Sequence, residues 1–277
     1  MRIHVLQVAY GDTEPVAERV ERVAELVRRQ RGADVVVLPE LWAHGGFAYT
    51  EWSKRAEPVD GPVVQALSAA AREIGASVHV GSIVARARSS AHASAPGDRS
   101  RGMSNTAVLL RSDGGVESVY RKIHRFGFGE GEPALLEAGT EVVTAVVAGR
   151  TGHGEAAPVT VGLATCYDLR FPELFRHLVD AGSELFVVPA AWPASRVEHW
   201  KLLGRARAVE NQCFVVQCNT AGTHSGVTMG GHSQIVSPTG AVLAEAGDDE
   251  ECIWADIDLA EMTSYRAAFP VLDDRRL

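Results

Sequence analysis

The feature of this chain that most constrains its fold is the alternation of short strand-like runs with longer helix-like runs. Asp34–Leu38 is an almost continuous apolar run, as expected of a strand that is covered on both faces. The preceding segment, Glu14–Gln30, repeats valine every three or four residues and so places these side chains on one helical face. Such alternation predicts an α/β protein in which helices pack on sheets in layers.

The same patterns continue to the end of the chain. We expect strands at Ile3–Val8, Asp34–Leu38, Ser77–Val84, Thr106–Leu110, Glu141–Val147, Pro158–Ala164, Glu184–Pro189, Cys213–Cys218, Ser233–Val236, Ala241–Glu245 and Cys252–Asp256. We expect helices at Glu14–Gln30, Gly61–Ile74, Phe171–Ala181, Arg196–Asn211 and Leu259–Phe269. The excess of strands fits a sandwich of two sheets with helices outside, although the pattern alone does not distinguish it from a barrel or a doubly wound sheet.

Domain organisation follows from the absence of obvious breaks in the 277-residue sequence. No linker or internal repeat divides it, so residues 1–277 are predicted to form a single domain. Ala85–Gly102 is rich in serine, alanine and arginine, which predicts a mobile surface loop inside a hairpin.

Composition narrows the possible partners and the compartment. The net charge of −8 does not favour binding to nucleic acid, whose phosphate groups are also negatively charged. No apolar run approaches the ~20 residues that a membrane helix needs. The N-terminal residues predict a first strand rather than a signal peptide. The four cysteines form no CxxC pair, which favours a reduced, cytoplasmic protein over a disulfide framework.

Two charged residues stand at positions where α/β proteins place their sites, close to the ends of apolar runs. Glu40 follows Val35–Pro39, where desolvation would raise the pKa of its carboxyl group and make it a usable base. A helix cap or an ordinary loop carboxylate is the alternative. Lys122 lies within Tyr120–Phe126 between arginines, in a chain that has only three lysines. Its ammonium group could bind a small anion, or the residue could belong to a solvated basic turn.

A third candidate, Cys166, ends an apolar strand about five residues before a predicted helix. The N-terminus of that helix could lower the pKa of the thiol, and backbone N–H groups beside it could bind an oxyanion. The alternative is a small buried core cysteine, which is the interpretation we favour for Cys213, Cys218 and Cys252. A carboxylate, an ammonium and a thiol together are a complete set for acyl transfer through a covalent intermediate.

These three residues lie in motifs that closely resemble those of the carbon–nitrogen hydrolase (nitrilase) superfamily. Glu40 lies in VVVLPELW, Lys122 in YRKIH and Cys166 in CYDLRFPELFR, which resemble the Glu–Lys–Cys triad motifs of that family. Further similar segments are PAAWP at Pro189–Pro193, RARAVENQCFVVQCN at Arg205–Asn219, GGHSQIVSPTG at Gly230–Gly240 and FPVLDDRR at Phe269–Arg276. The resemblance implies a four-layer α-β-β-α sandwich, a homodimer, and a site without a metal or organic cofactor.

The resemblance also implies a reaction and a role for each residue. Glu40 would take the thiol proton, and Cys166 would attack a carbonyl or nitrile carbon. Lys122 and the backbone N–H of Tyr167 would hold the developing oxyanion. Ammonia or an amine would then leave, and water activated by Glu40 would cleave the thioester. A second glutamate of the site, usual in this family, would assist that water.

The best match to this second glutamate is Glu132, because Gly139 follows it at the expected distance; Glu130 is the other candidate. The same triad would also serve an N-carbamoyl amino acid hydrolase or an aliphatic nitrilase. A scaffold that keeps the triad without turnover is the alternative that is not an enzyme.

The substrate class is suggested by CYDLRFPELFR, which is most similar to the branch that contains omega-amidases and deaminated-glutathione amidases. These enzymes hydrolyse amides of small carboxylate-bearing compounds. Arg170 could pair with the substrate carboxylate, or it could form an internal ion pair with Asp168 or Glu173. Trp192 could wall the pocket, or it could simply pack in the core.

Overall fold

The structure is a computed structural model, and it describes residues 1–86, 102–150 and 156–276. The strands of one sheet are β1 (Arg2–Gln7), β2 (Val35–Val37), β3 (Ser77–Arg86), β4 (Met103–Leu110), β5 (Val116–Arg121) and β14 (Glu251–Asp256). Those of the other are β6 (Thr144–Arg150), β7 (Ala156–Leu163), β8 (Leu185–Pro189), β9 (Phe214–Cys218), β12 (Gln234–Val236) and β13 (Val242–Glu245). A short hairpin pairs β10 (Thr223–His224) with β11 (Val227–Thr228).

Both large sheets have parallel strands at their centres. The first has the order β14-β1-β2-β3-β4-β5, in which β1, β2 and β3 are parallel. The second has the order β13-β12-β9-β8-β7-β6, in which β7, β8 and β9 are parallel. Because parallel neighbours end on the same side, the segments that leave β2 and β7 can bring polar residues to one edge of the sandwich.

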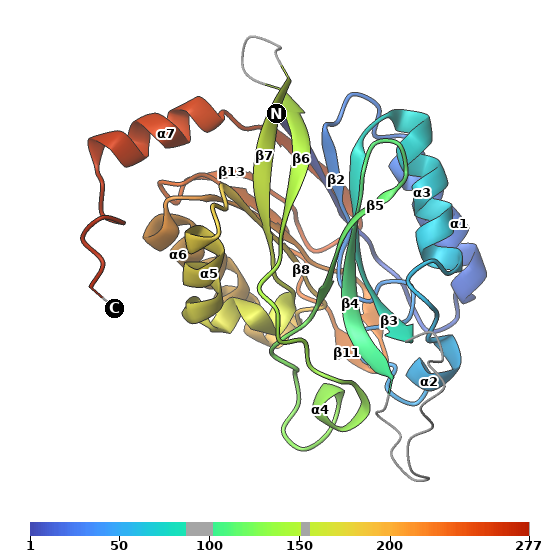
Figure 1. Cartoon of the computed structure of the whole chain (residues 1–277). Helices are drawn as coiled ribbons and strands as arrows, with labels where there is room; N and C mark the ends of the chain where they lie inside the picture. The colour runs from blue at the N-terminus through green and yellow to red at the C-terminus, as the bar shows by residue number, and fades with distance from the viewer. Residues whose placement is uncertain (87–101, 151–155, 277) are drawn as a thin grey trace.

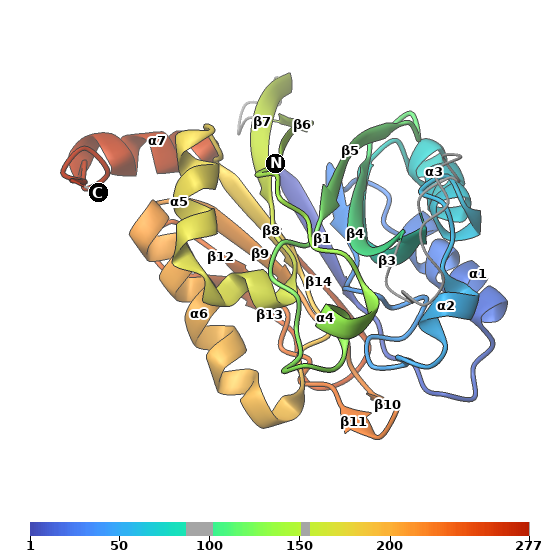
Figure 2. The same cartoon turned by 60° about the horizontal axis from the view of Figure 1, so that its bottom comes forward.

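Helices cover the outer face of each sheet, as Figures 1 and 2 show. The helices α1 (Val16–Arg28) and α3 (Pro62–Ile74) lie on the first sheet, and α5 (Pro172–Asp180) and α6 (Val197–Asn211) lie on the second. Local sequence explains where several of them begin and end. Pro62 and Pro172 stand at first helical positions, where the missing N–H costs nothing. Gly75 ends α3 with a φ of +68°, a conformation that favours glycine.

The inner core lies between the two sheets. It joins buried aliphatic residues from both, including Val5 and Val37 of the first sheet and Val161, Val187 and Val216 of the second. Separate apolar clusters fill the space between each sheet and its helices. The order of layers is therefore α-β-β-α, which confirms the predicted fold class.

Every strand and helix that we expect from the sequence is present, within a few residues at each end. The sequence patterns missed the edge strand β5, the β10–β11 hairpin and the short helices α2 (Trp52–Arg55) and α4 (Glu132–Leu135). β5 escaped because it is an edge strand whose residues are mostly half-exposed, so its apolar alternation is weak. β3 extends to Arg86, and the rest of the expected surface loop at 85–102 lies almost wholly outside the described residues.

The short elements that the sequence missed lie near the end of the sandwich where the site is found. Figure 2 brings α4, α2 and the β10–β11 hairpin to the front of the molecule. In the described residues, no helix has the length and apolar character required to span a bilayer.

Candidate active site

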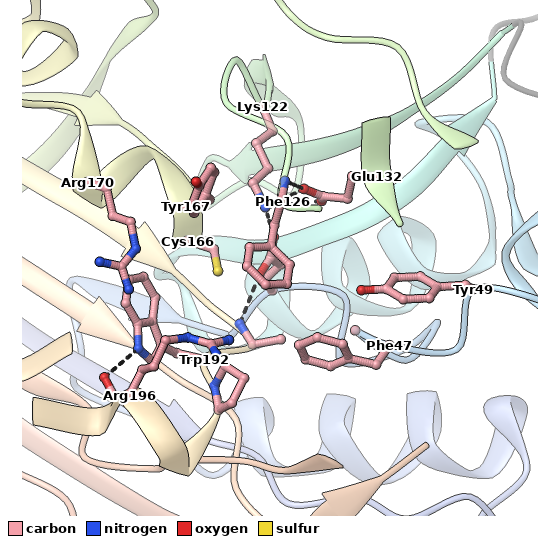
Figure 3. Close-up of a pocket in the computed structure, with 14 residues that line it drawn as sticks. Phe47, Tyr49, Lys122, Phe126, Glu132, Cys166, Tyr167, Arg170, Trp192 and Arg196 are labelled. Carbon is pink, nitrogen blue, oxygen red and sulfur yellow. Dashed lines mark hydrogen bonds and ion pairs between the residues drawn. The ribbon is translucent and has the colours of Figure 1, made fainter. Parts of the chain in front are cut away.

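The structure brings the three predicted candidates together in one pocket (Figure 3). Glu40 lies just after β2, Lys122 follows β5, and Cys166 begins the 3₁₀ turn Cys166–Arg170 that leads from β7 to α5. Glu132, the first residue of α4, also lines this pocket, whereas Glu130 is exposed and does not. The pocket is open to solvent, and about 420 Å³ of free space lies within and in front of it, which allows a small molecule to enter.

The centre of the site is an ammonium held between two carboxylates. Lys122 Nζ lies 2.7 Å from Glu40 Oε1 and 2.9 Å from Glu132 Oε2, and its side chain is only 2% exposed. Burial alone would lower the pKa of Lys122, but Glu132 and Glu40 outweigh it and raise that pKa well above its ordinary value. Lys122 is therefore a permanent cation at neutral pH.

A carboxamide and two backbone N–H groups complete this cluster. Asn105 Nδ2 donates to Glu40 Oε1 at 2.7 Å and to Glu132 Oε1 at 2.6 Å. The N–H of Ala191 donates to Glu40 Oε2 at 2.9 Å, and the N–H of Phe126 donates to Glu132 Oε2. Burial raises the pKa of Glu132, Lys122 opposes the rise, and the neighbouring Glu40 adds to it.

Cys166 faces this cluster from a strained position. It has a φ of +49°, which costs free energy in a residue with a Cβ, and it is 7% exposed. Burial raises the pKa of its thiol well above the ordinary value, and the nearby carboxylate of Glu40 raises it further. Our expectation that the helix N-terminus lowers this pKa is therefore wrong. The resting thiol is neutral, and its activation requires transfer of the proton to a base.

Asp168 forms hydrogen bonds that link the segment carrying Lys122 to the turn that begins at Cys166. Its fully buried carboxylate accepts hydrogen bonds from the Tyr120 hydroxyl at 2.7 Å and from the Thr165 N–H at 2.9 Å. The N–H and Nδ1 of His124 lie 2.9 and 2.7 Å from its other oxygen. Tyr120 and His124 flank Lys122, and Thr165 precedes Cys166 in sequence. One carboxylate thus fixes the relative position of the two segments.

The wall beside the thiol carries two guanidinium groups. Figure 3 shows Arg170, Trp192 and Arg196 on one side of Cys166, while Tyr49 and Phe47 lie on the other. Arg170 lies over the Trp192 ring at 4.7 Å, and its Nη2 is 3.3 Å from Nδ1 of His199.

The expected alternatives for Arg170 and Trp192 can be compared with this geometry. Neither Asp168 nor Glu173 forms an ion pair with Arg170, although both are among the described residues. Trp192 lines the pocket and also packs against Trp200, with 5.5 Å between ring centroids, so both interpretations hold for it. Tyr167 lines the pocket as well.

Three residues of the site were not identified as site residues from the sequence: Asn105, Asp168 and Arg196. Asn105 lies in β4 between Ser104 and Thr106, so nothing in this polar stretch of the sequence singles it out as a site residue. In the sequence analysis, Asp168 was considered only as an ion-pair partner of Arg170. Arg196 was placed at the start of a helix, with no signal that it would line the pocket, where it lies over the Phe126 ring at 5.5 Å.

The remaining cysteines lie away from this pocket. Cys213, just before β9, and Cys218, at its end, are both buried, as expected of core cysteines, and they belong to different apolar clusters. Cys252 is exposed, which corrects our interpretation of it as a core residue, because it lies on the edge strand β14. In the described residues, no group of three or more His, Cys, Asp or Glu side chains is arranged to hold a metal ion.

Comparison with known proteins agrees with this geometry. Residues 2–267 match the family model described as "Carbon-nitrogen hydrolase". The chain is 45% identical over 274 residues to a 2-oxoglutaramate amidase of Paenarthrobacter nicotinovorans, covering 99% of this chain and 89% of that protein. It is 34% identical to a 2-oxoglutaramate amidase of Bacillus subtilis, covering 97% and 94% respectively. Among solved structures, the CN-hydrolase superfamily protein XC1258 of Xanthomonas campestris superimposes with a TM-score of 0.85 at 28% identity, covering 100% of this chain and 97% of that one.

Proposed function

Because the chain belongs to the carbon–nitrogen hydrolase family and is an amide-hydrolysing enzyme, we propose that it hydrolyses the terminal amide of a small 2-oxo acid such as 2-oxoglutaramate. The observation that carries the proposal is the convergence of Glu40, Lys122 and Cys166 in one pocket, with two guanidinium groups beside the thiol. The two relatives named 2-oxoglutaramate amidase, each covered almost completely, supply the substrate class.

The first half of the reaction forms a thioester and releases ammonia. Glu40 accepts the proton of Cys166 as the sulfur attacks the amide carbon. The oxyanion that forms is held by the ammonium of Lys122 and by the backbone N–H of Tyr167, which belongs to the first turn of a helix and needs no partner within it. The tetrahedral intermediate collapses, its C–N bond breaks, and the proton on Glu40 passes to the departing nitrogen.

The second half returns the enzyme to its resting state. Water enters the position that ammonia has left, and Glu40 removes one proton from it during attack on the thioester. The carbon–sulfur bond then breaks, the carboxylic acid leaves, and the thiolate recovers a proton from Glu40. Glu132 assists by holding Lys122 and, through Asn105, the side chain of Glu40.

Arg170 and Arg196 recognise the acidic end of the substrate. Both line the pocket, and among the described residues neither forms an ion pair with a carboxylate. A substrate carboxylate could therefore satisfy them with bidentate hydrogen bonds. The aromatic surfaces of Trp192 and Phe126, which lie against these guanidinium groups, would keep them oriented.

We also propose that the enzyme acts as a homodimer in the cytoplasm. All four cysteines are free, as in a reducing compartment. Leu202 and Val209 on α6 are 66% and 46% exposed, which suits contact with a second copy. Light scattering coupled to gel filtration should give twice the chain mass, and a monomer at micromolar concentration would contradict the proposal.

The test of the proposed function is ammonia release across a panel of small substrates. The panel contains 2-oxoglutaramate, other ω-monoamides, deaminated glutathione, N-carbamoyl amino acids and short aliphatic nitriles. We expect fastest turnover of 2-oxoglutaramate and none by the Cys166→Ser variant, whose fold should be intact. Preference for an N-carbamoyl compound or a nitrile, or turnover by Cys166→Ser, would refute the proposal.

Carboxylate recognition is tested with Arg170→Met. Loss of a hydrogen-bonded charge pair should raise KM for 2-oxoglutaramate by about 10- to 100-fold. A neutral ω-amide of similar length is the control, because its KM should change little. An equal rise for both substrates would show that Arg170 only shapes the pocket.

A further inference from the structure

We propose that Asn105 is a positioning residue for Glu40: its carboxamide joins the two carboxylates of the site and keeps Glu40 oriented to accept the thiol proton. The inference rests on the proposed function, because it takes Glu40 as the base. Asn105 lies on β4 and is 1% exposed, so bulk water cannot take its place in the folded enzyme.

The two hydrogens of the carboxamide nitrogen go to two different carboxylates. Nδ2 lies 2.7 Å from Glu40 Oε1 and 2.6 Å from Glu132 Oε1, and an amide nitrogen has two hydrogens to donate. Glu40 and Glu132 come from separate segments, one after β2 and the other at the start of α4. The backbone oxygen of Asn105 also accepts from the N–H of Lys122 at 2.9 Å. Asn105 is thus in contact with every other member of the carboxylate–ammonium cluster.

Charge balance explains why a neutral donor is needed at this position. Lys122 supplies one positive charge against two carboxylates, so the buried cluster has an excess of negative charge when both are ionised. Cys166, Tyr49 and Tyr10 also interact electrostatically with these carboxylates, and none of the three supplies a positive charge. Hydrogen bonds to an ionised carboxylate favour that form, and a carboxamide provides them without changing the total charge.

The contacts also identify the oxygen that accepts the proton. A carboxylate offers four lone-pair positions, two on each oxygen. Glu40 Oε1 accepts from both Lys122 and Asn105, and Oε2 accepts from the N–H of Ala191. The remaining lone pair is therefore on Oε2, and that atom receives the proton from Cys166. Without Asn105, a lone pair on Oε1 would compete for the same proton.

The other end of the carboxamide shows that stability alone does not explain this residue. Asn105 Oδ1 is buried and has no hydrogen-bond partner among the described residues. A buried acceptor without a partner destabilises the fold, and an apolar side chain of similar size would avoid that cost. The side chain of Asn105 thus places Oδ1 where it has no protein partner among the described residues, while its Nδ2 makes two short hydrogen bonds.

The test is the pH profile of kcat/KM for 2-oxoglutaramate in Asn105→Leu, which fills the space but cannot donate. The hydrogen bond from Asn105 lowers the pKa of Glu132, and loss of the donor also removes a hydrogen bond from the carboxylate of Glu40. The acid limb should therefore move up by about one to two pH units. Activity should recover towards the wild-type value at higher pH. Thr106→Val is the matched control, because Thr106 lies next to Asn105, is equally buried, and bonds to Ser104 instead.

Alkylation of Cys166 by iodoacetamide gives a second readout that does not require turnover. Its pH dependence should show the same upward shift in Asn105→Leu and none in Thr106→Val. If the leucine variant does not fold, Asn105→Ala should show the shift in both measurements.

Activity that falls equally at every pH, with an unmoved acid limb, would overturn the inference and leave Asn105 a structural residue. Failure of the wild-type chain to hydrolyse any amide of the panel would instead overturn the proposed function.

Discussion

Replacement of Lys122 by methionine should reveal how strongly the buried ammonium holds the site together. Methionine is unbranched and only one atom shorter than lysine but carries no charge, so the change leaves Glu40 and Glu132 facing each other without a cation. Removal of one partner from a buried charge pair costs about 3–5 kcal/mol. For a chain of 277 residues, that cost corresponds to a fall in Tm of roughly 5–9 °C.

The loss should depend on pH in a direction that the charges determine. In the wild type, the pKa of Lys122 is raised above its ordinary value of 10.5, so its stabilisation is complete below that pH and is lost only as the pH rises through the folded-state pKa. Burial raises the pKa of Glu132 above its ordinary value of 4.5 and Lys122 opposes that rise, so removal of Lys122 should raise this pKa further. Stability is then lost as the pH rises above 4.5, so the Tm difference between the two proteins should widen from pH 4.5 to pH 8.

The assay is thermal unfolding followed by circular dichroism across this pH range. Lys54→Met is the matched control, because Lys54 is 71% exposed and its ion pair with Glu51 is at the surface. Such a pair contributes less than about 1 kcal/mol, so the control should differ from wild type by only a few degrees. A Lys122→Met protein whose Tm deficit matches that of the control, or does not change with pH, would refute this account of the cluster.

Two other properties of the site lead to measurable outcomes. Asp168→Asn should lower kcat by about 100-fold and change KM little, because the substrate contacts remain while the lysine and cysteine segments lose their alignment; a change confined to KM would contradict this role. At pH 7, iodoacetamide should label Cys166 faster than Cys252, whose pKa partial burial and Glu251 raise to about 11, because Glu40 is placed to accept the proton of Cys166 as it reacts. Peptide mapping that finds both labelled at the same rate would show that Glu40 does not activate the thiol.

Several features of the fold were readable from the sequence because their causes are local. A strand that is covered on both faces must be apolar, and a helix on a sheet must repeat apolar residues at its own period. These requirements located β2, α1 and the other central elements. β5 was missed because an edge strand with a half-exposed face has no such requirement.

The thiol of Cys166 shows how local reasoning fails at the site itself. The turn and the following helix indicated a lowered pKa, and both are present. The pKa is nevertheless raised, because burial and the carboxylate of Glu40, brought from the other sheet, outweigh the local contribution. Asn105 and Asp168 were overlooked as members of the site for a related reason, since their importance depends on partners that are distant in sequence.

The layered α/β architecture and the three strand-end motifs could be inferred from the order of the amino acids, because burial and backbone geometry select residue types within a few positions of one another. The charge balance of the site could not: that Glu40 and Glu132 share Lys122, and that the pKa of the Cys166 thiol is raised, follow from contacts between segments far apart in the chain. Electrostatic interactions depend on distance in space and on exclusion of water, and both are fixed only when the two sheets pack together.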